Sequence, residues 1–572
     1  MKKIVFSALA LAGGVSIVSA QSLDDGIQAL YYQKFTSATQ ILQQVVQKDP
    51  KNAEAAYWLG QVYLDNRNET NGVQKAAQLY QQTATAVGPN SWLLVGLGQI
   101  DYINKNTAAA EQKFEQANQL SSKLKGKKDK NQAAIYTAIG RASAYGDKEL
   151  GDPSYAIPLL QQAANLDKTA PEPDLYLGLN FLKLGGDMGG NAYSAYNDAV
   201  TRDPKFAAGY YHMGVIFHAQ DNFEVMDMWY QKGIAADPNY GPIYLDYFDY
   251  WKNKDVNKAK TYLDKYVAAS DKGCDVQYYQ AEYSFEAGTY QQSLDLAKQM
   301  ESGPCGTYSH LPLLMAMDYH RLGDNANATT YAKKFFTAAS PMSITPDDYA
   351  FGGYILMGDS ATAGEAIGYL QKAYALDTLP ADRATISDSI SYAFEKANQP
   401  QQKYDWDRHI FDTKDTGSNG YNLAIFNVGI DALKLGATDP KYYATADSFF
   451  VKYKTRYPAQ IYGYQYLAQS KMMQGDTTAA TPFVEDYVNQ MMKDTAKYKG
   501  TITEQYGTLA GYYVNSKGDY TTGLKYFQGI LAADPNNEQV KQYADQIQAY
   551  LDKKNKADSS ANKSSGAKKS PK

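Results

Sequence analysis

The chain has 572 residues, enough for several domains or for one long array, and its content of 44% hydrophobic and 20% charged residues is ordinary for a globular protein. The formal charge of −5 is unevenly spread. Residues 1–20 carry two Lys and residues 553–572 carry seven Lys and one Asp, which leaves −13 on the body between them. This acidic body disfavours nucleic acid as the main partner.

Residues 1–20 have the pattern of a secretory signal peptide. Two lysines precede an apolar run at residues 4–12, and small residues at 18–20 offer a cleavage site. The alternative is a retained membrane anchor, although the run is short for a span. No Cys follows the cleavage site, so a lipoprotein is not expected, and no later segment is apolar enough to cross a membrane. The Met-Lys-Lys opening is typical of bacteria, so we expect export to the periplasm or the exterior.

One pattern recurs along residues 21–340, and two of its spacings are 34 residues. Gly26 and Gly60 are 34 residues apart, and so are the Asp-Pro pairs that end at Pro204 and Pro238. A fixed period of this length indicates a repeat architecture. We count nine units in this N-terminal array, each predicted as two helices joined by a turn.

The unit at residues 207–238 shows how one repeat is built. An apolar stripe with i, i+3, i+4, i+7 spacing starts at Tyr210 and predicts the first helix. Gly214 and Gly233 let the two helix backbones approach closely, and Pro238 ends the second helix. One pair cannot bury its apolar face alone, so such pairs stack into arrays.

This unit resembles the tetratricopeptide repeat. Counted from Ala207, Gly214 and Gly233 stand at the family's small positions 8 and 27, Tyr230 at its aromatic position 24, and Pro238 at position 32. The resemblance covers most of residues 24–551. It implies an all-α fold, a right-handed α-solenoid of about thirteen tetratricopeptide-like helix pairs with a C-terminal capping helix.

Residues 341–420 break this rhythm. Four prolines and a polar run from Asp412 to Gly420 interrupt the helical pattern. The stretch is predicted to be irregular, either as diverged repeats with long loops or as a hinge between two sub-arrays, and the sequence leaves both open.

The pattern returns at Tyr421. Residues 421–552 are predicted as a C-terminal array that ends in a largely polar capping helix, roughly Asn537 to Leu551. The Lys/Ser-rich residues 553–572 contain no aromatic side chain and are predicted to be disordered. We expect a solvating tail, with contact to an anionic surface such as the cell wall as the alternative.

No motif points to catalysis. The five histidines form no close cluster with Cys or Glu at metal-ligand spacing, and there is neither a Gly-rich phosphate loop nor a nucleophile elbow. The repeats nearly reach the C-terminus, which leaves no room for a catalytic domain. We therefore expect no enzymatic activity, no cofactor and no metal.

The two cysteines, Cys274 and Cys305, are 31 residues apart. They are predicted at neighbouring ends of an antiparallel helix pair. In an oxidising compartment a disulfide here would contribute ~3–4 kcal/mol through loop closure. Two unpaired thiols are the alternative, and the sequence does not decide between them.

The resemblance also implies a concave groove lined by the first helices, with positions 5, 9 and 12 pointing into it. No basic residue stands at position 5 of the units inspected, so capture of acidic C-terminal peptides by Lys is not expected. Tyr and Gln suit extended peptides, because a ring supplies contact area at low entropic cost. The alternative for each Tyr is a packing role. The predicted partner-binding residues are Tyr57, Gln61, Val95, Gln99, Tyr102, Tyr211, Val215, His218 and Tyr278.

Two functions follow. The first is a non-catalytic exported scaffold or adaptor that binds a protein or peptide in its concave groove, in cell-envelope assembly. The second is a carbohydrate-binding protein whose groove tyrosines stack on sugar rings. Helical-repeat nutrient-binding proteins of Bacteroidota are the analogy for the second, but they are lipoproteins with large insertions, and this chain shows neither feature.

Overall fold

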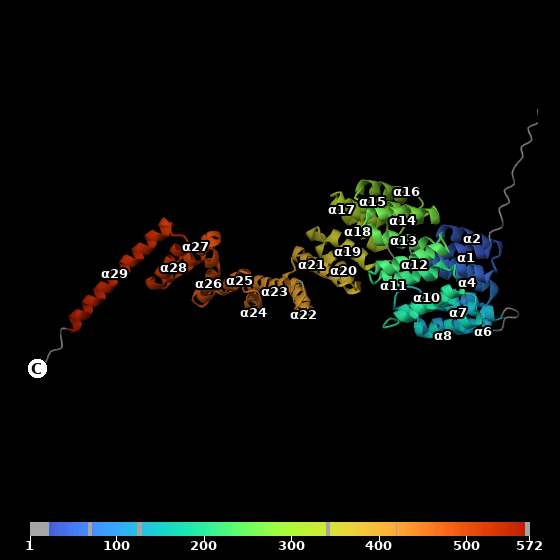
Figure 1. Ribbon diagram of the computed structural model, residues 1–572, viewed down its shortest axis with the longest axis horizontal. Coiled ribbons are helices and arrows are strands. Elements are labelled where there is room, and N and C mark those ends of the chain that lie inside the picture. The colour runs from blue at the N-terminus through green and yellow to red at the C-terminus, as the bar shows by residue number, and fades with distance from the viewer. Residues whose placement is uncertain (1–21, 67–70, 123–127, 339–343, 419, 567–572) are drawn as a thin grey trace, which may run out of the picture. The chain divides into compact units, whose positions relative to one another are not determined.

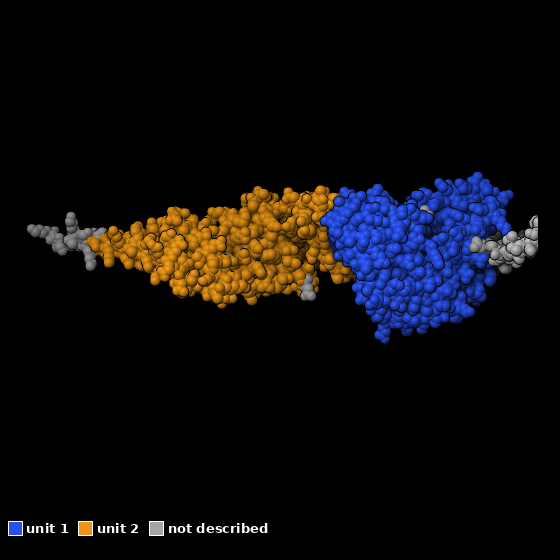
Figure 2. All heavy atoms as spheres, turned by 90° about the horizontal axis from the view of Figure 1, so that it is seen from above, with its two compact units in different colours: residues 1–355 blue, residues 356–572 orange. Residues whose placement is uncertain are grey.

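The computed structural model describes residues 22–66, 71–122, 128–338, 344–418 and 420–566. The predicted signal peptide lies outside these ranges. All regular elements within them are helices (Figure 1), so the prediction of an all-α solenoid of helix pairs is confirmed. The chain divides into two compact units, residues 1–355 and residues 356–572 (Figure 2), which are described separately below.

Unit 1 contains the helices of the N-terminal array. They are α1 (Leu23–Tyr31), α2 (Phe35–Lys48), α3 (Ala53–Asp65), α4 (Gly72–Val87), α5 (Ser91–Ile103), α6 (Thr107–Ser121), α7 (Lys128–Ala144), α8 (Pro153–Leu166), α9 (Glu172–Leu184), α10 (Gly189–Arg202), α11 (Ala207–His218), α12 (Phe223–Ala236), α13 (Gly241–Lys252), α14 (Val256–Ala269), α15 (Cys274–Glu286), α16 (Tyr290–Ser302), α17 (Leu311–Arg321), α18 (Asn325–Ala338) and α19 (Pro346–Leu356), whose last residue falls in unit 2.

Unit 2 contains the remaining helices. They are α20 (Ser360–Leu376), α21 (Pro380–Lys396), α22 (Pro400–Thr413), α23 (Tyr421–Gly436), α24 (Lys441–Arg456), α25 (Tyr462–Met473), α26 (Thr477–Met491), the 3-10 turn η2 (Met492–Asp494), α27 (Thr495–Gly511), the π-helical turn η3 (Tyr512–Ser516), α28 (Tyr520–Ala533) and α29 (Glu538–Gly566).

Consecutive helices pack in pairs from α1–α2 to α17–α18, which matches the nine predicted units. In addition, α3 packs on α5, α5 on α7, and α7 on α9. The odd-numbered helices therefore form an inner layer and the even-numbered helices cover it on the outside.

Close packing within a pair depends on a glycine in the first helix. A Cβ added at Gly214 would lie inside van der Waals contact with the ring of Tyr230, and the same holds for Gly98 against Phe114. Tyr230 and Phe114 are fully buried. The large ring of the second helix therefore packs directly against the glycine of the first helix, as the repeat pattern predicts.

The first helix pair of unit 1 contacts the start of α11, the segment between α12 and α13, and the segment between α14 and α15. Tyr32 on the C-terminal side of α1 donates a hydrogen bond to Asp237 Oδ2 at 2.7 Å, and the backbone N–H of Ser37 donates to Asp271 Oδ2 at 2.8 Å. The array of unit 1 thus closes on itself, and its inner layer surrounds an interior space.

Residues 346–413 lie in the stretch predicted to be irregular, either as diverged repeats with long loops or as a hinge, and they form the four helices α19 to α22. One expectation about the C-terminal half needs correction. The capping helix does not end near Leu551, because α29 continues to Gly566. Residues 553–566 are therefore helical rather than disordered, and residues 567–572 lie outside the described ranges.

Candidate functional site

Five of the nine predicted groove residues are buried inside unit 1. Tyr57, Gln61, Val95 and Gln99 are 0% exposed and Tyr102 is 2% exposed. These side chains lie in the core between neighbouring repeats, so they offer no surface to a partner.

Hydrogen bonds explain why amides occupy these positions. The amide of Gln61 donates to the hydroxyl of Tyr80 at 3.0 Å and to Gln99 Oε1 at 2.7 Å. The hydroxyl of Tyr80 donates in turn to the backbone carbonyl of Tyr57 at 3.1 Å. The two glutamines therefore link α3, α4 and α5, and their role is structural.

The other four predicted residues are half-buried. Tyr211 lines the interior of unit 1, Val215 packs against the core, and Tyr278 stacks on Tyr308 with ring centroids 4.7 Å apart. The ring of His218 contacts Asp246 at 3.0 Å, and the hydrogen bond with this carboxylate raises the pKa of His218.

An arginine that sequence reasoning passed over lies at the centre of this interior. Arg141 on α7 forms an ion pair with Asp65 on α3, donates to Gln61 Oε1 at 3.0 Å, and donates to the hydroxyl of Tyr176 on α9. Its guanidinium also lies 5.4 Å from the centroid of the Trp58 ring. The paired carboxylate keeps the pKa of Arg141 above its ordinary value although burial opposes this. Arg141 directly follows Gly140, so it stands at position 9 of its repeat, the position of Gln61 and Gln99.

The inner layer encloses a cavity of about 780 Å³. Its lining comes from all the odd-numbered helices from α1 to α15, with further residues from α2 and α14. The aromatic residues in this lining are Tyr31, Phe35, Trp58, Trp92, Tyr145, Tyr176, Phe206, Tyr211, Tyr240, Tyr266 and Tyr279. Tyr211 is the only predicted groove residue among the residues that line this cavity.

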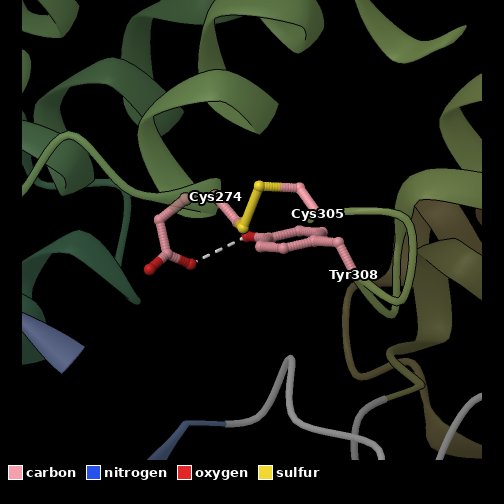
Figure 3. Close-up of a disulfide and its surroundings, with 4 residues drawn as sticks. Cys274, Cys305 and Tyr308 are labelled. Carbon is pink, nitrogen blue, oxygen red and sulfur yellow. Dashed lines mark hydrogen bonds between the residues drawn. A yellow bond between two sulfur atoms is a disulfide. The ribbon is translucent and has the colours of Figure 1, made fainter. Parts of the chain in front are cut away.

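Cys274 and Cys305 form a disulfide in this structure, with Cα atoms 5.4 Å apart. It joins the start of α15 to the loop that follows α16 (Figure 3). In the same loop Tyr308 donates a hydrogen bond to Asp275 Oδ1 at 3.0 Å, which ties the loop to α15 a second time.

Unit 2 differs from unit 1 in what it exposes. Most of the large apolar side chains that are well exposed lie in unit 2, including Leu423 at 50% and Tyr462 at 52%. Phe426 lies one helical turn after Leu423, and its ring centroid is 6.2 Å from that of Tyr462. Leu423, Phe426 and Tyr462 form what we call the unit-2 apolar surface. It lies on α23 and α25, the first helices of two neighbouring pairs.

The described ranges contain no group of three or more His, Cys, Asp or Glu side chains that could hold a metal ion. Nor does any helix there have the length and apolar character needed to cross a bilayer.

Comparison with protein families identifies the repeat. Residues 23–89 match the model of the tetratricopeptide repeat family, and in the structure this segment forms the first two helix pairs. Together with the helix pairs that follow, this confirms the prediction of a tetratricopeptide repeat protein. Among curated proteins, no significant match is found.

Many solved structures of helical-repeat proteins are similar to this chain, at low identity. The C-terminal part of a repeat-containing protein from Cytophaga hutchinsonii is 20% identical, with 46% of this chain and 98% of that chain covered and a TM-score of 0.34. Cut9-Hcn1 of the APC/C is 13% identical, with 91% and 95% covered and a TM-score of 0.38. Yeast Tom70 is 12% identical, with 66% and 88% covered and a TM-score of 0.38. We draw no functional conclusion from these likenesses.

Proposed function

We propose that this protein is a non-catalytic scaffold of the bacterial cell envelope that binds a protein partner through the unit-2 apolar surface. The observation that carries the proposal is the exposure of Leu423 and Tyr462 on first helices of the C-terminal array. Repeat arrays present their binding surfaces on such layers. In unit 1 the corresponding layer faces the interior of the closed array, so we assign the partner surface to unit 2.

The chemistry of this surface favours a protein partner. Leu423 and Tyr462 are exposed on two helices, and the half-buried ring of Phe426 contacts that of Tyr462 from the core side. Exposed apolar groups of this kind serve as anchors at protein interfaces, where aromatic residues contribute much of the binding energy.

Export is supported by two independent features. The N-terminal sequence has the order of a signal peptide, with lysines, an apolar run and small residues. The disulfide in unit 1 suits an oxidising compartment such as the periplasm. Both the signal-peptide pattern and the disulfide are compatible with a scaffold in the cell envelope.

The test compares three forms of the full mature chain in affinity capture from envelope extracts of the source cells. They are the native protein, a double variant with Leu423→Ser and Tyr462→Ser, and a control with Val451→Ser. Val451 is also exposed, at 47%, but lies on the second helix α24. Circular dichroism checks that all three forms are folded.

We expect a defined protein to be retained by the native and control forms and lost with the double variant. Its direct binding is then measured with the purified partner. Equal retention by all three forms, or retention of polysaccharide alone, contradicts the proposal. The second outcome would favour the carbohydrate-binding alternative. Fractionation of cells with an antibody against the protein tests the location, and a cytoplasmic signal contradicts it.

A further inference from the structure

The cavity of unit 1 is elongated and follows α7 over nearly the whole length of this helix. Its lining includes Lys130, Thr137, Arg141 and Ala144, so it extends along α7 for roughly 21 Å at a rise of ~1.5 Å per residue. A volume of about 780 Å³ over that length gives a mean cross-section of roughly 37 Å². The cavity therefore has room for a narrow chain of small rings rather than for a compact ligand.

The cavity can be reached from solvent at the end where α7 begins. Lys130 belongs to the lining, yet its side chain is 60% exposed. Every residue of the lining lies in unit 1, so the cavity is separate from the unit-2 apolar surface. The proposed scaffold function does not use it.

Aromatic rings and hydrogen-bonding groups lie side by side on the wall near Arg141. The half-buried rings of Trp58 and Trp92 have centroids 6.1 Å apart. The guanidinium of Arg141 lies 5.4 Å from the centroid of the Trp58 ring and is paired with Asp65, which also belongs to the lining. A ligand that covers these rings therefore meets both donors and acceptors at their edge.

The same combination recurs on α11. The rings of Tyr211 and His212 both line the cavity, with centroids 4.9 Å apart. Burial lowers the pKa of His212 to about 4, so its imidazole is neutral at pH 7 and offers one hydrogen-bond donor and one acceptor. The wall thus offers a ring face beside hydrogen-bonding groups at two separate places.

The basic side chains of the described lining are already paired. Arg141 forms an ion pair with Asp65. Lys130 lies 3.5 Å from Asp167, a second carboxylate of the lining. An anionic ligand would therefore have to compete with a carboxylate of the protein for each of these cations.

The other carboxyl groups of the lining do not select a cation either. Asp275 accepts a hydrogen bond from the hydroxyl of Tyr308 at 3.0 Å. Desolvation raises the pKa of Glu172 above its ordinary value, which favours the uncharged form. The lining thus gives no preference for a charged ligand of either sign.

The helical origin of the wall restricts the neutral ligands that fit. Most of the lining comes from helices, whose backbone N–H and C=O groups are bonded along the helix, so hydrogen bonds to a ligand come from side chains. An extended peptide bound as an added strand would find no backbone partners here. A plain hydrocarbon chain would bury the polar side chains of the wall without hydrogen bonds.

We propose that this cavity binds a neutral linear oligosaccharide. Each sugar unit carries C–H groups on its faces and hydroxyls around its edge, so it can cover an aromatic ring and exchange hydrogen bonds with the polar side chains beside that ring. The narrow section admits successive sugar units in single file along α7. No group of the ligand then carries a charge that must be desolvated.

The experiment measures binding to the full mature protein by titration calorimetry, supported by the fluorescence of Trp58 and Trp92. The probes are the pentasaccharides cellopentaose, maltopentaose and chitopentaose, each compared with its own monosaccharide. A capped neutral heptapeptide of Gly, Ala and Ser is the control for a peptide ligand. We expect at least one pentasaccharide to bind about tenfold or more tightly than its monosaccharide, because the longer chain contacts more of the wall.

Two variants locate the site, and a matched control accompanies them. Trp92→Leu removes a ring of the lining, whereas Trp251→Leu removes a ring that is also half-buried but lies outside the lining. We expect Trp92→Leu to weaken binding of the pentasaccharide roughly tenfold and Trp251→Leu to leave it unchanged. Thr137→Phe places a ring in the middle of the narrow section and should abolish binding.

Circular dichroism checks that the variants are folded. If Thr137→Phe does not fold, the comparison of Trp92→Leu with Trp251→Leu decides alone. The double variant Leu423→Ser, Tyr462→Ser should bind the pentasaccharide like the native protein, so the sugar site and the proposed partner surface can fail independently.

Three results overturn the proposal. The first is no binding of any of the three pentasaccharides up to about 10 mM, where the binding free energy is too small for a specific site. The second is binding of the heptapeptide in place of the sugars, which would show that the cavity is a peptide site. The third is an equal effect of Trp92→Leu and Trp251→Leu, which would place any sugar binding outside the cavity.

Discussion

The buried charge network of unit 2 allows a direct test of the packing argument. Lys403 Nζ lies 2.9 Å from Asp407 Oδ2 and 2.8 Å from Asp431 Oδ2. The side chains of these three residues are 12%, 7% and 3% exposed. One ammonium thus compensates two carboxylates in the contact between α22 and α23.

Replacement Lys403→Met keeps the length of the side chain and removes its charge. Loss of one partner from a buried ion pair costs ~3–5 kcal/mol, because a charge then stays buried without compensation. Here two carboxylates lose their partner, so we expect the upper part of this range at pH 8. The triple variant Lys403→Met, Asp407→Asn, Asp431→Asn should recover most of the loss.

The loss should depend on pH in a defined direction. Burial, together with the neighbouring Asp407, raises the pKa of Asp431 to about 7, above the ordinary value of 3.8. The folded state therefore binds this proton more readily than the unfolded state does. Its contribution to stability is complete below pH ~4 and is lost as the pH rises through 7. The loss of stability caused by Lys403→Met should therefore be large at pH 8 and clearly smaller at pH 5.

The assay is hydrogen exchange followed by mass spectrometry. A repeat array unfolds locally, and this method measures the protection of backbone amides in α22 and α23 separately. Lys441→Met is the control, since Lys441 pairs with Asp439 at the exposed surface and its removal should change nothing measurable. Equal protection in the two variants at pH 8 would refute the reasoning. An equal loss at pH 5 and pH 8 would refute the electrostatic part of it.

Three further predictions concern unit 1. Gly214→Ala should lower the free energy of unfolding by ~1–3 kcal/mol in chemical denaturation, because the added methyl group meets the buried ring of Tyr230. Gly190→Ala is the control and should not destabilise the protein, because an added Cβ there meets no atom within 4 Å. Similar effects of the two variants would contradict the packing of the α11–α12 pair. Burial raises the pKa of the fully buried Asp318 carboxyl to about 7, so the native protein should lose on the order of 4 kcal/mol of stability between pH 4 and 8. Asp318→Asn should remove this pH dependence, and a variant with the pH profile of the native protein would contradict the prediction. Reduction of the disulfide should lower the stability of unit 1 by ~3–4 kcal/mol, and reaction with a thiol reagent before reduction would show that the bond is absent.

The charge network around Lys403 also explains why the repeat pattern could not be recognised in the sequence of α21 and α22. In several pairs a glycine in the first helix meets a large ring in the second, as Gly214 meets Tyr230 sixteen residues later. In α21 and α22 that spacing joins Ser391 to Asp407, whose carboxylate accepts a hydrogen bond from the serine hydroxyl at 3.1 Å. A polar contact serves here in place of the glycine and the ring. The helices form, but the size pattern by which repeats are recognised is missing.

The sequence alone determined the type of repeat, its period and the nine units of the N-terminal array. These features depend on side-chain size and on helix-ending residues within some 34 neighbours, so they can be read locally. The pairing of Gly214 with Tyr230 belongs to this class. The start of the capping helix could also be predicted from the local sequence. The continuation of α29 to Gly566 could not, because polar residues are compatible both with a helix and with disorder.

Only the tertiary structure decided which surfaces are open. The closure of unit 1 places Tyr31 against Tyr240 and Ser37 against Asp271, more than 200 residues apart in each case. The path of a solenoid is the sum of small rotations between successive repeats, so it depends on every contact in the array and on no single motif. For this reason Tyr57 and Gln99, which the repeat pattern assigns to an open groove, are buried, while Arg141 and the cavity around it became visible only in the folded chain.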